Sequence, residues 1–295
     1  MYHLVYGILY LFSLLPLRVL YLFADLCYLI LYYVVGYRRD VVAANLLQAF
    51  PEKTEEERKR IEKKFYRNFC DNFVEVLKLI SASKQFVNKH FTGDYTVFND
   101  IHAQGKRCQF LLSHHFNWEL ACVGIPMHVR ALFLVAYMPV TNKVFDRLMI
   151  HIRTRTGAAL VPATDMSRSM MKFRREHYIL ALVADQNAGY VPTAHWITFF
   201  GKPAPFVTAP ESGARRSNIP VVFGHFKKLG RGKYTSTYVL AESDPSSLPV
   251  GELTVRYARF LEAVIREQPE TWLWSHRRWK WEWKEEYSPV LDAGR

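Results

Sequence analysis

The segment between residues 109 and 120 holds a histidine and a glutamate, His114 and Glu119, that could act together as a base and its orienting acid. An apolar run over 110–112 stops just before the histidine, and a helix-compatible run starts near Asn117. On one continuous helix, positions five apart point about 140° away from each other. A strand, a turn and a helix start would instead let the chain double back, so we expect the carboxylate to reach the imidazole.

Such a pair would carry out general-base chemistry. The carboxylate fixes the tautomer and stabilises the imidazolium, while the other ring nitrogen accepts a proton from an attacking group. A hydroxyl or amine of the substrate could then be the nucleophile, without a Ser or Cys of the protein. Two alternatives remain open: His114 caps the helix beside a solvated Glu119, or both bind zinc with His115. Because adjacent histidines rarely converge on one ion, we expect no metal.

Further blocks of the chain support a resemblance. His114-x4-Glu119, with Asn117-Trp118 inside it, resembles the H-x4-D/E signature of the bacterial lipid A biosynthesis (late) acyltransferases, within the lysophospholipid-acyltransferase-like superfamily. The similarity runs from about residue 45 to 280. The other blocks are Asn45-Leu46 with Phe50-Pro51, Tyr137-Met138-Pro139 with Asn142 and Asp146, Arg153 with Gly157, Asp185-Gln186 with Phe199-Phe200-Gly201, and Pro269-Glu270 with Trp274 and His276-Arg277-Arg278-Trp279-Lys280.

The resemblance implies a membrane-associated acyltransferase that needs no cofactor. It would move a fatty acyl chain from an acyl thioester onto a lipid acceptor, either lipid A precursor-like or another lyso-, amino- or glycolipid. Acyl carrier protein is the expected donor, and acyl-CoA stays open. The expected catalytic residues are His114 as base and Glu119 as its orienter. The expected substrate-binding residues are Arg153 as a phosphate clamp, Asp185 as a carboxylate ordering Arg153 or the acceptor headgroup, and Asn117, Gln186 and Phe116.

Two positions depart from the family pattern. Phe116 stands where the family has Gly, and Met138 stands where it has Arg. The missing arginine removes one cationic contact to a phosphate or thioester donor. The Phe116 ring adds bulk beside the base, so we expect it to help set acyl length. The alternative is that this ring points into the core.

Composition favours an anionic partner. The chain has 295 residues and a formal net charge of +12. A lipid surface, lipid phosphates, an acidic carrier protein and nucleic acid would all suit this charge. We expect no nucleic acid, because the basic residues are dispersed and no known nucleic-acid-binding motif is present. The cysteines have no paired short spacing and predict reduced core thiols: Cys27, Cys70, Cys108 and Cys122.

The N-terminal part predicts a membrane anchor. Residues 4–35 are almost wholly apolar, and 17–35 alone is near the length of a spanning helix. A single span, an in-plane anchor and a buried helix pair all remain open. Arg38 and Arg39 follow this stretch, so the positive-inside tendency predicts a catalytic domain on the cytoplasmic side of the inner membrane. We expect three parts: the anchor (1–38), the acyltransferase domain (39–286) and a loose tail (287–295).

The remaining pattern alternates strands and helices. This predicts an α/β fold with a mixed, mostly parallel sheet flanked by helices. Expected strands are 110–112, 132–137, 178–184, 220–225 and 234–240, and expected helices are 52–79, 146–156, 166–176, 208–217 and 250–267. Polar turns follow three strands, at Ser113, Pro139 and Asp185, so we expect the three signature blocks at one sheet edge. A catalytically idle lipid-binding protein and a lipid hydrolase on the same pair are the alternative functions.

Overall fold

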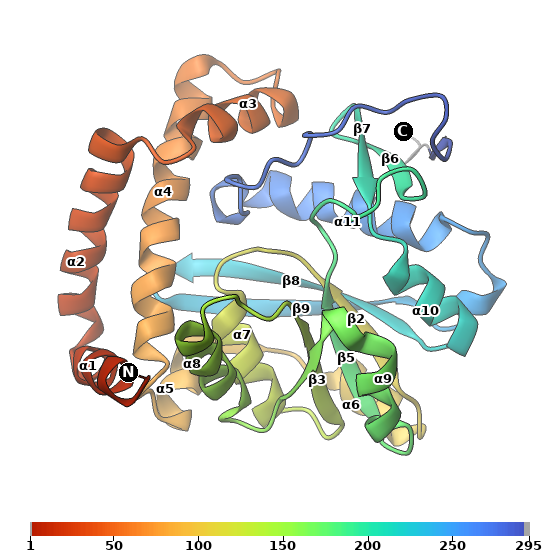
Figure 1. Cartoon of the computed structure of the whole chain (residues 1–295), viewed down its shortest axis with the longest axis horizontal. Helices are drawn as coiled ribbons and strands as arrows, with labels where there is room; N and C mark the ends of the chain where they lie inside the picture. The colour runs from red at the N-terminus through yellow and green to blue at the C-terminus, as the bar shows by residue number, and fades with distance from the viewer. Residues whose placement is uncertain (1, 292–295) are drawn as a thin grey trace.

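A mixed seven-stranded sheet forms the centre of the computed structural model, which describes residues 2–291 (Figure 1). Its strand order is β1-β9-β8-β2-β5-β3-β4. The strands are β1 (Phe91–Gly93), β2 (Cys108–Leu112), β3 (Leu132–Tyr137), β4 (Ala159–Pro162), β5 (Tyr178–Val183), β8 (Val221–Gly230) and β9 (Lys233–Glu242). Strands β8, β2, β5, β3 and β4 run parallel, and β9 is antiparallel to β8. The predicted α/β class is therefore confirmed.

Helices cover both faces of this sheet (Figure 1). The helices between residues 39 and 267 are α3 (Arg39–Ala49), α4 (Glu55–Lys78), α5 (Lys84–His90), α6 (Thr96–Ala103), α7 (Trp118–Gly124), α8 (Lys143–Thr154), α9 (Met166–Met170), α10 (Ala209–Ser217) and α11 (Glu252–Glu267). Of these, α3 packs on α4 beyond the sheet (Figure 1). Successive strand residues point to opposite faces. Leu111 of β2 therefore joins the core beneath α11, whereas Phe110 and Leu112 join the core on the side of α6 and α7. Because both faces are covered, β2 is buried along its whole length.

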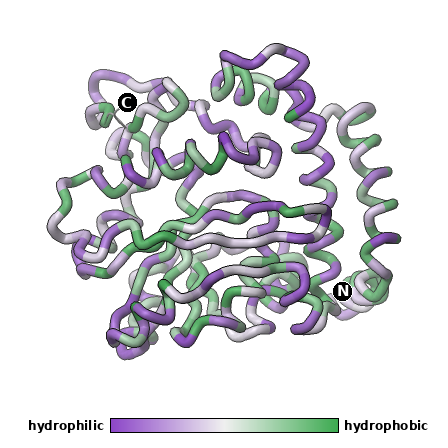
Figure 2. Tube along the Cα trace, turned by 180° about the vertical axis from the view of Figure 1, so that it is seen from behind, coloured by the Kyte–Doolittle hydropathy of each residue, from purple (hydrophilic) through white to green (hydrophobic). Residues whose placement is uncertain are grey.

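The N-terminal helices pack along the outer side of α4 (Figure 1). They are α1 (Tyr2–Leu14), α2 (Leu17–Leu29) and the π-helical continuation η1 (Ile30–Val35). Residues 17–35 form the one helix within 2–291 that is long and apolar enough to cross a membrane, with a mean hydropathy of 1.7. Only 22% of that stretch is buried, and Figure 2 shows it at the edge of the molecule. A possible membrane anchor is therefore supported.

Small elements near the C-terminal end depart from the prediction. A second sheet has the order β10-β6-β7, with β6 (His195–Phe199), β7 (Lys202–Phe206) and β10 (Val290–Leu291). Two prolines in β7 hide its strand character, because proline lacks the amide donor of a regular ladder. The loose tail expected from residue 287 is wrong over 287–291. There Tyr287 stacks on Trp196, and β10 pairs with β6. Residues 292–295 lie outside the described part of the chain.

The cysteines are free thiols, but only three of them are buried. Cys27 is exposed, because it sits on the part of α2 that faces away from the protein. The expectation of a core position is wrong for this residue. The other three, Cys70, Cys108 and Cys122, lie in the protein interior.

Gly224 of β8 provides a stability test of the central sheet. A Cβ built there would lie 2.1 Å from the Phe110 ring of the neighbouring strand. The Phe110 ring packs against the Tyr238 ring, and the two ring centroids lie 5.5 Å apart. We expect Gly224→Ala to lower the free energy of unfolding by about 1–3 kcal/mol, because overpacking forces the core to shift. Urea unfolding would measure this. Gly189→Ala is the matched control, since nothing lies within 4 Å of its added Cβ. Equal stabilities of the two variants would contradict the packing described.

Candidate active site

His114 occupies the turn between β2 and α7. The strand ends at Leu112, and Asn117 begins the helix as its N-cap, with Oδ1 accepting the backbone N–H of Leu120 at 2.9 Å. Asparagine suits this place because its short side chain satisfies an amide that the helix leaves unpaired. The imidazole is partly open to solvent, with 23% of its side chain exposed. This is the strand–turn–helix arrangement predicted for the segment.

The carboxylate of Asp185 holds the imidazole. Asp185 follows β5, the neighbour of β2, so both residues lie at the carboxyl edge of the sheet. Its Oδ1 accepts a hydrogen bond from His114 Nδ1 at 2.7 Å, and its Oδ2 accepts one from the His114 amide at 2.9 Å. Since Nδ1 donates, Nε2 is the nitrogen available to accept a proton.

A tryptophan completes the surroundings of this carboxylate. The indole Nε1 of Trp272 donates to Asp185 Oδ2 at 2.7 Å. Burial alone would raise the pKa of the Asp185 carboxyl. The imidazole and the three donated hydrogen bonds outweigh burial and hold this pKa well below its usual range. The carboxylate is therefore ionised although only 1% of the residue is exposed.

Glu119 does not orient His114, which corrects the expected pairing. Its Oε2 accepts from Arg153 Nε at 2.8 Å, and its Oε1 accepts from Arg153 Nη2 at 2.5 Å. Trp118 Nε1 adds a contact at 3.1 Å. Glu119 stands in the first turn of α7, which packs against α8, whereas the end of β5 adjoins the histidine. Asp185 was also expected to order Arg153. Instead, Arg153 pairs with Glu119, and Asp185 pairs with His114.

Arg153 is a rigid cation in this arrangement. Burial alone would lower the pKa of its guanidinium, but the bonds and charge of Glu119 raise it above its usual range. The bidentate pairing fixes the plane of the guanidinium. Glu119 takes the Nε and Nη2 donors, and Nη1 stays available for another acceptor.

Asn117 and Phe116 are core residues. Both are fully buried, and Asn117 Nδ2 donates to Glu75 Oε2 at 2.9 Å. The Phe116 ring stacks between Phe65 and Trp118, with centroid separations of 6.0 and 5.6 Å. The Phe116 ring therefore points into the core, which was the alternative expectation for it. Asn117 stabilises the turn and the start of α7.

Gln186 is the polar side chain nearest the free imidazole nitrogen. Its Nε2 lies 3.5 Å from His114 Nε2, at the limit of a hydrogen bond. The Trp118 ring meets the imidazole edge-on at a centroid separation of 5.4 Å. The opening at His114 is therefore bordered by one amide and one aromatic ring. His115 points away from it and is fully buried, with Nδ1 2.5 Å from Ser113 Oγ.

The segment around Trp272 is a site component that the sequence did not reveal. It runs alongside the histidine turn: Phe116 N donates to Thr271 O at 2.9 Å, and Leu273 N donates to His114 O at 3.1 Å. The sequence alone assigned no contact with the histidine turn to Trp272. The sequence feature that pointed to Trp272 was its place two residues after Pro269-Glu270, inside a family block. Within residues 2–291, no three His, Cys, Asp or Glu side chains converge as a metal site would require.

These features define an α/β protein with a histidine held by a buried carboxylate at the edge of its sheet. The family model described as bacterial lipid A biosynthesis acyltransferase matches residues 1–281. The chain belongs to this family, and the protein is an acyltransferase. A comparison with curated protein sequences gave no match.

The pH dependence of stability tests the assigned carboxylate. A carboxyl whose pKa is lowered by folding stabilises the fold above its unfolded pKa of about 4, and this stabilisation is lost as the pH falls. We expect Asp185→Asn to cost on the order of 3 kcal/mol near pH 7, since it leaves buried partners unmatched. The difference from wild type should shrink below about pH 4. Urea unfolding in detergent between pH 3 and 7 would measure it. Glu285→Gln, an exposed control, should change little; a constant difference for Asp185→Asn across this range would refute the assignment.

Proposed function

We propose that this acyltransferase moves a fatty acyl chain from an acyl thioester onto a hydroxyl or amine of a lipid acceptor related to lipid A precursors, with His114 as the general base. The observation that carries the proposal is the 2.7 Å contact between His114 Nδ1 and the ionised Asp185, which leaves Nε2 free at a partly exposed position. A partly exposed base also argues against the idle lipid-binding alternative.

The reaction follows from this geometry. Nε2 of His114 takes the proton of the acceptor hydroxyl or amine as that group attacks the thioester carbonyl carbon. Asp185 stabilises the resulting imidazolium. The tetrahedral intermediate then expels the thiolate, and the imidazolium returns its proton to the leaving sulfur. One acyl–sulfur bond breaks and one acyl–oxygen or acyl–nitrogen bond forms, so the protein returns to its starting state.

Substrate contacts can be assigned to two neighbouring groups. Gln186 lies close enough to His114 Nε2 to donate to the attacking oxygen or to the developing oxyanion. Arg153 keeps Nη1 for a phosphate of donor or acceptor, while Glu119 holds the guanidinium in place. Asn117 acts indirectly, by fixing the turn that carries the base.

The setting of the reaction is proposed to be the cytoplasmic face of the inner membrane. Residues 17–35 have the length and hydropathy of a spanning helix, and Arg38 and Arg39 follow them. The net charge of +12 suits both an anionic lipid surface and an acidic carrier protein as acyl donor. A lipid hydrolase would use the same base with water in place of the acceptor.

Substitutions at His114, Asp185 and Glu119 distinguish three proposed roles: the general base, the carboxylate that orients it and the carboxylate that holds Arg153. We expect His114→Ala to lower kcat on the order of 10²–10⁴-fold, the size of a positioned general-base contribution. Asp185→Asn should approach that loss, and Glu119→Gln should mainly raise KM through a loosened Arg153. Steady-state assays with acyl carrier protein thioesters would measure both constants. The proposal fails if folded His114→Ala turns over at the wild-type rate, and the assignment of Asp185 fails if Glu119→Gln is the more damaging change in kcat.

The outer face of α2 tests the anchor. Leu22 and Leu26 are exposed there, and replacing both by Glu leaves the inner face packed on α4. We expect the double variant to leave the membrane fraction, because a charge in the apolar core of a bilayer costs several kcal/mol. Fractionation after a high-salt wash would measure this, since salt screens surface attraction. Leu240→Glu, at another exposed apolar position, is the control. Unchanged membrane retention of the double variant would rule out insertion of this face.

A further inference from the structure

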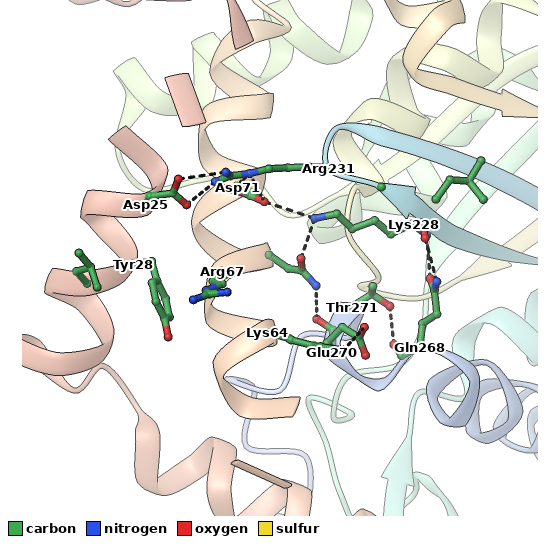
Figure 3. A pocket seen from close by; sticks show the side chains of 14 residues that line it. Asp25, Tyr28, Lys64, Arg67, Asp71, Lys228, Arg231, Gln268, Glu270 and Thr271 are labelled. Atoms are coloured by element: carbon green, nitrogen blue, oxygen red, sulfur yellow. Dashed lines mark hydrogen bonds and ion pairs between the residues drawn. The ribbon is translucent and has the colours of Figure 1, made fainter. Parts of the chain in front are cut away.

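A large cavity lies between the apolar helix α2 and the body of the protein (Figure 3), and His114 is not among the residues that line it. Its volume is about 670 Å³, within the usual range for small-molecule sites. Its walls come from α2, α4, the end of β8 with the turn that follows it, and the short helix η6 (Pro269–Thr271). Nothing in the proposed acyl transfer uses this space.

The charges around the cavity leave one positive charge unbalanced. Four cations and three carboxylates line it: Lys64, Arg67, Lys228, Arg231, Asp25, Asp71 and Glu270. Arg231 Nη2 contacts Asp71 Oδ1 at 2.6 Å and Asp25 Oδ1 at 2.7 Å. Lys228 approaches the same Asp71. The net charge of the lining is therefore positive by one.

Arg67 carries this unbalanced charge. Lys64 Nζ lies 3.8 Å from Glu270, whereas Arg67 has no carboxylate within ion-pair distance among residues 2–291. Its guanidinium lies over the Tyr28 ring, 5.1 Å from the centroid. Tyr28 is buried beside this guanidinium and orients it, so that the Arg67 donors face a ligand in the cavity.

The position of the cavity points to a lipid. Arg60, Lys64 and Arg67 are exposed and follow helical spacing, so they form a basic stripe on α4 that leads to the opening. Two exposed leucines, Leu29 of the apolar helix and Leu229 near the end of β8, line the same cavity. A phosphate at Arg67 would thus have apolar side chains beside it, as the headgroup and first methylenes of a bilayer lipid require.

We propose that this cavity binds the phosphate headgroup of an anionic membrane lipid, with Arg67 as the principal phosphate contact. The proposal rests on the proposed membrane contact of α2 and is independent of acyl transfer at His114. The cavity also adjoins the active site, since Thr271 lines it and the next residue, Trp272, holds Asp185. Lipid bound here would therefore contact the segment that positions the base.

Lipid binding to the full-length chain in non-ionic detergent tests the proposal. Native mass spectrometry would follow phosphatidylglycerol, with zwitterionic phosphatidylcholine as the comparison lipid. We expect Arg67→Glu to weaken phosphatidylglycerol binding roughly tenfold, equivalent to about 1.4 kcal/mol. Arg175→Glu makes the same charge change at an exposed position beyond α9, far from α2 (Figure 1), and should bind as wild type. Arg67→Gln removes the charge without reversing it and should show an intermediate loss.

The outcomes separate the possible ligands. Equal losses for Arg67→Glu and Arg175→Glu, or equal binding of both lipids, would mean general surface attraction and overturn the proposal. Inorganic phosphate that binds through Arg67 as tightly as phosphatidylglycerol would overturn the assignment to a lipid. His114→Ala should keep wild-type lipid binding. Failure of acyl transfer and failure of this site are therefore distinguishable.

Discussion

The buried carboxylate of Asp185 is the constraint on which the site depends. An ionised carboxylate away from water costs several kcal/mol unless its oxygens are matched by donors. Here three donors match them, the ring and the amide of His114 and the indole of Trp272, so two distant places in the chain supply the hydrogen bonds. These bonds form only when three segments are in place together: the turn after β2, the end of β5 and the segment that contains Trp272. The tautomer that makes Nε2 basic follows from this convergence.

A second buried carboxylate, Glu75 of α4, connects the apolar helix α2 to the same turn. It accepts hydrogen bonds from Tyr21 of α2, Asn117 at the start of α7 and Tyr234 of β9, at 2.8 to 2.9 Å. Burial raises the pKa of this carboxyl, and the hydrogen bonds only partly offset that effect. Since Asn117 also caps α7, the position of α2 and that of the histidine turn are linked through the Glu75 side chain.

Two arginines of this fold, Arg153 and Arg67, differ in how their charge is balanced. Arg153 is held by the Glu119 carboxylate at the candidate active site and presents one remaining donor there. Arg67, in contrast, is the unbalanced cation of a cavity beside the apolar helix. The overall excess of +12 reflects a surface suited to anionic partners, while the contacts of each cation decide what it can bind.

Much of the architecture could be read from local pattern. The apolar runs of the central strands, at 132–137 for example, predicted strands that agree with the structure, because buried parallel strands are apolar along their length. The histidine turn and the long apolar helix were predictable for similar reasons of pattern and length. The family blocks also identified His114, Arg153 and Asp185 as a group of functional candidates.

Only the tertiary structure decided which partners these residues have. Glu119 is five positions from His114 in the chain, yet it faces Arg153, whereas Asp185 is 71 positions away and contacts the imidazole. Adjacency of β2 and β5 places Asp185 there, and sequence spacing does not encode strand order. Phe116 shows the same limit: its bulk was evident in the sequence, but the packing of α4 turned its ring into the core. Local sequence patterns determine the helices and strands, while contacts between residues distant in the chain determine the chemistry of a site.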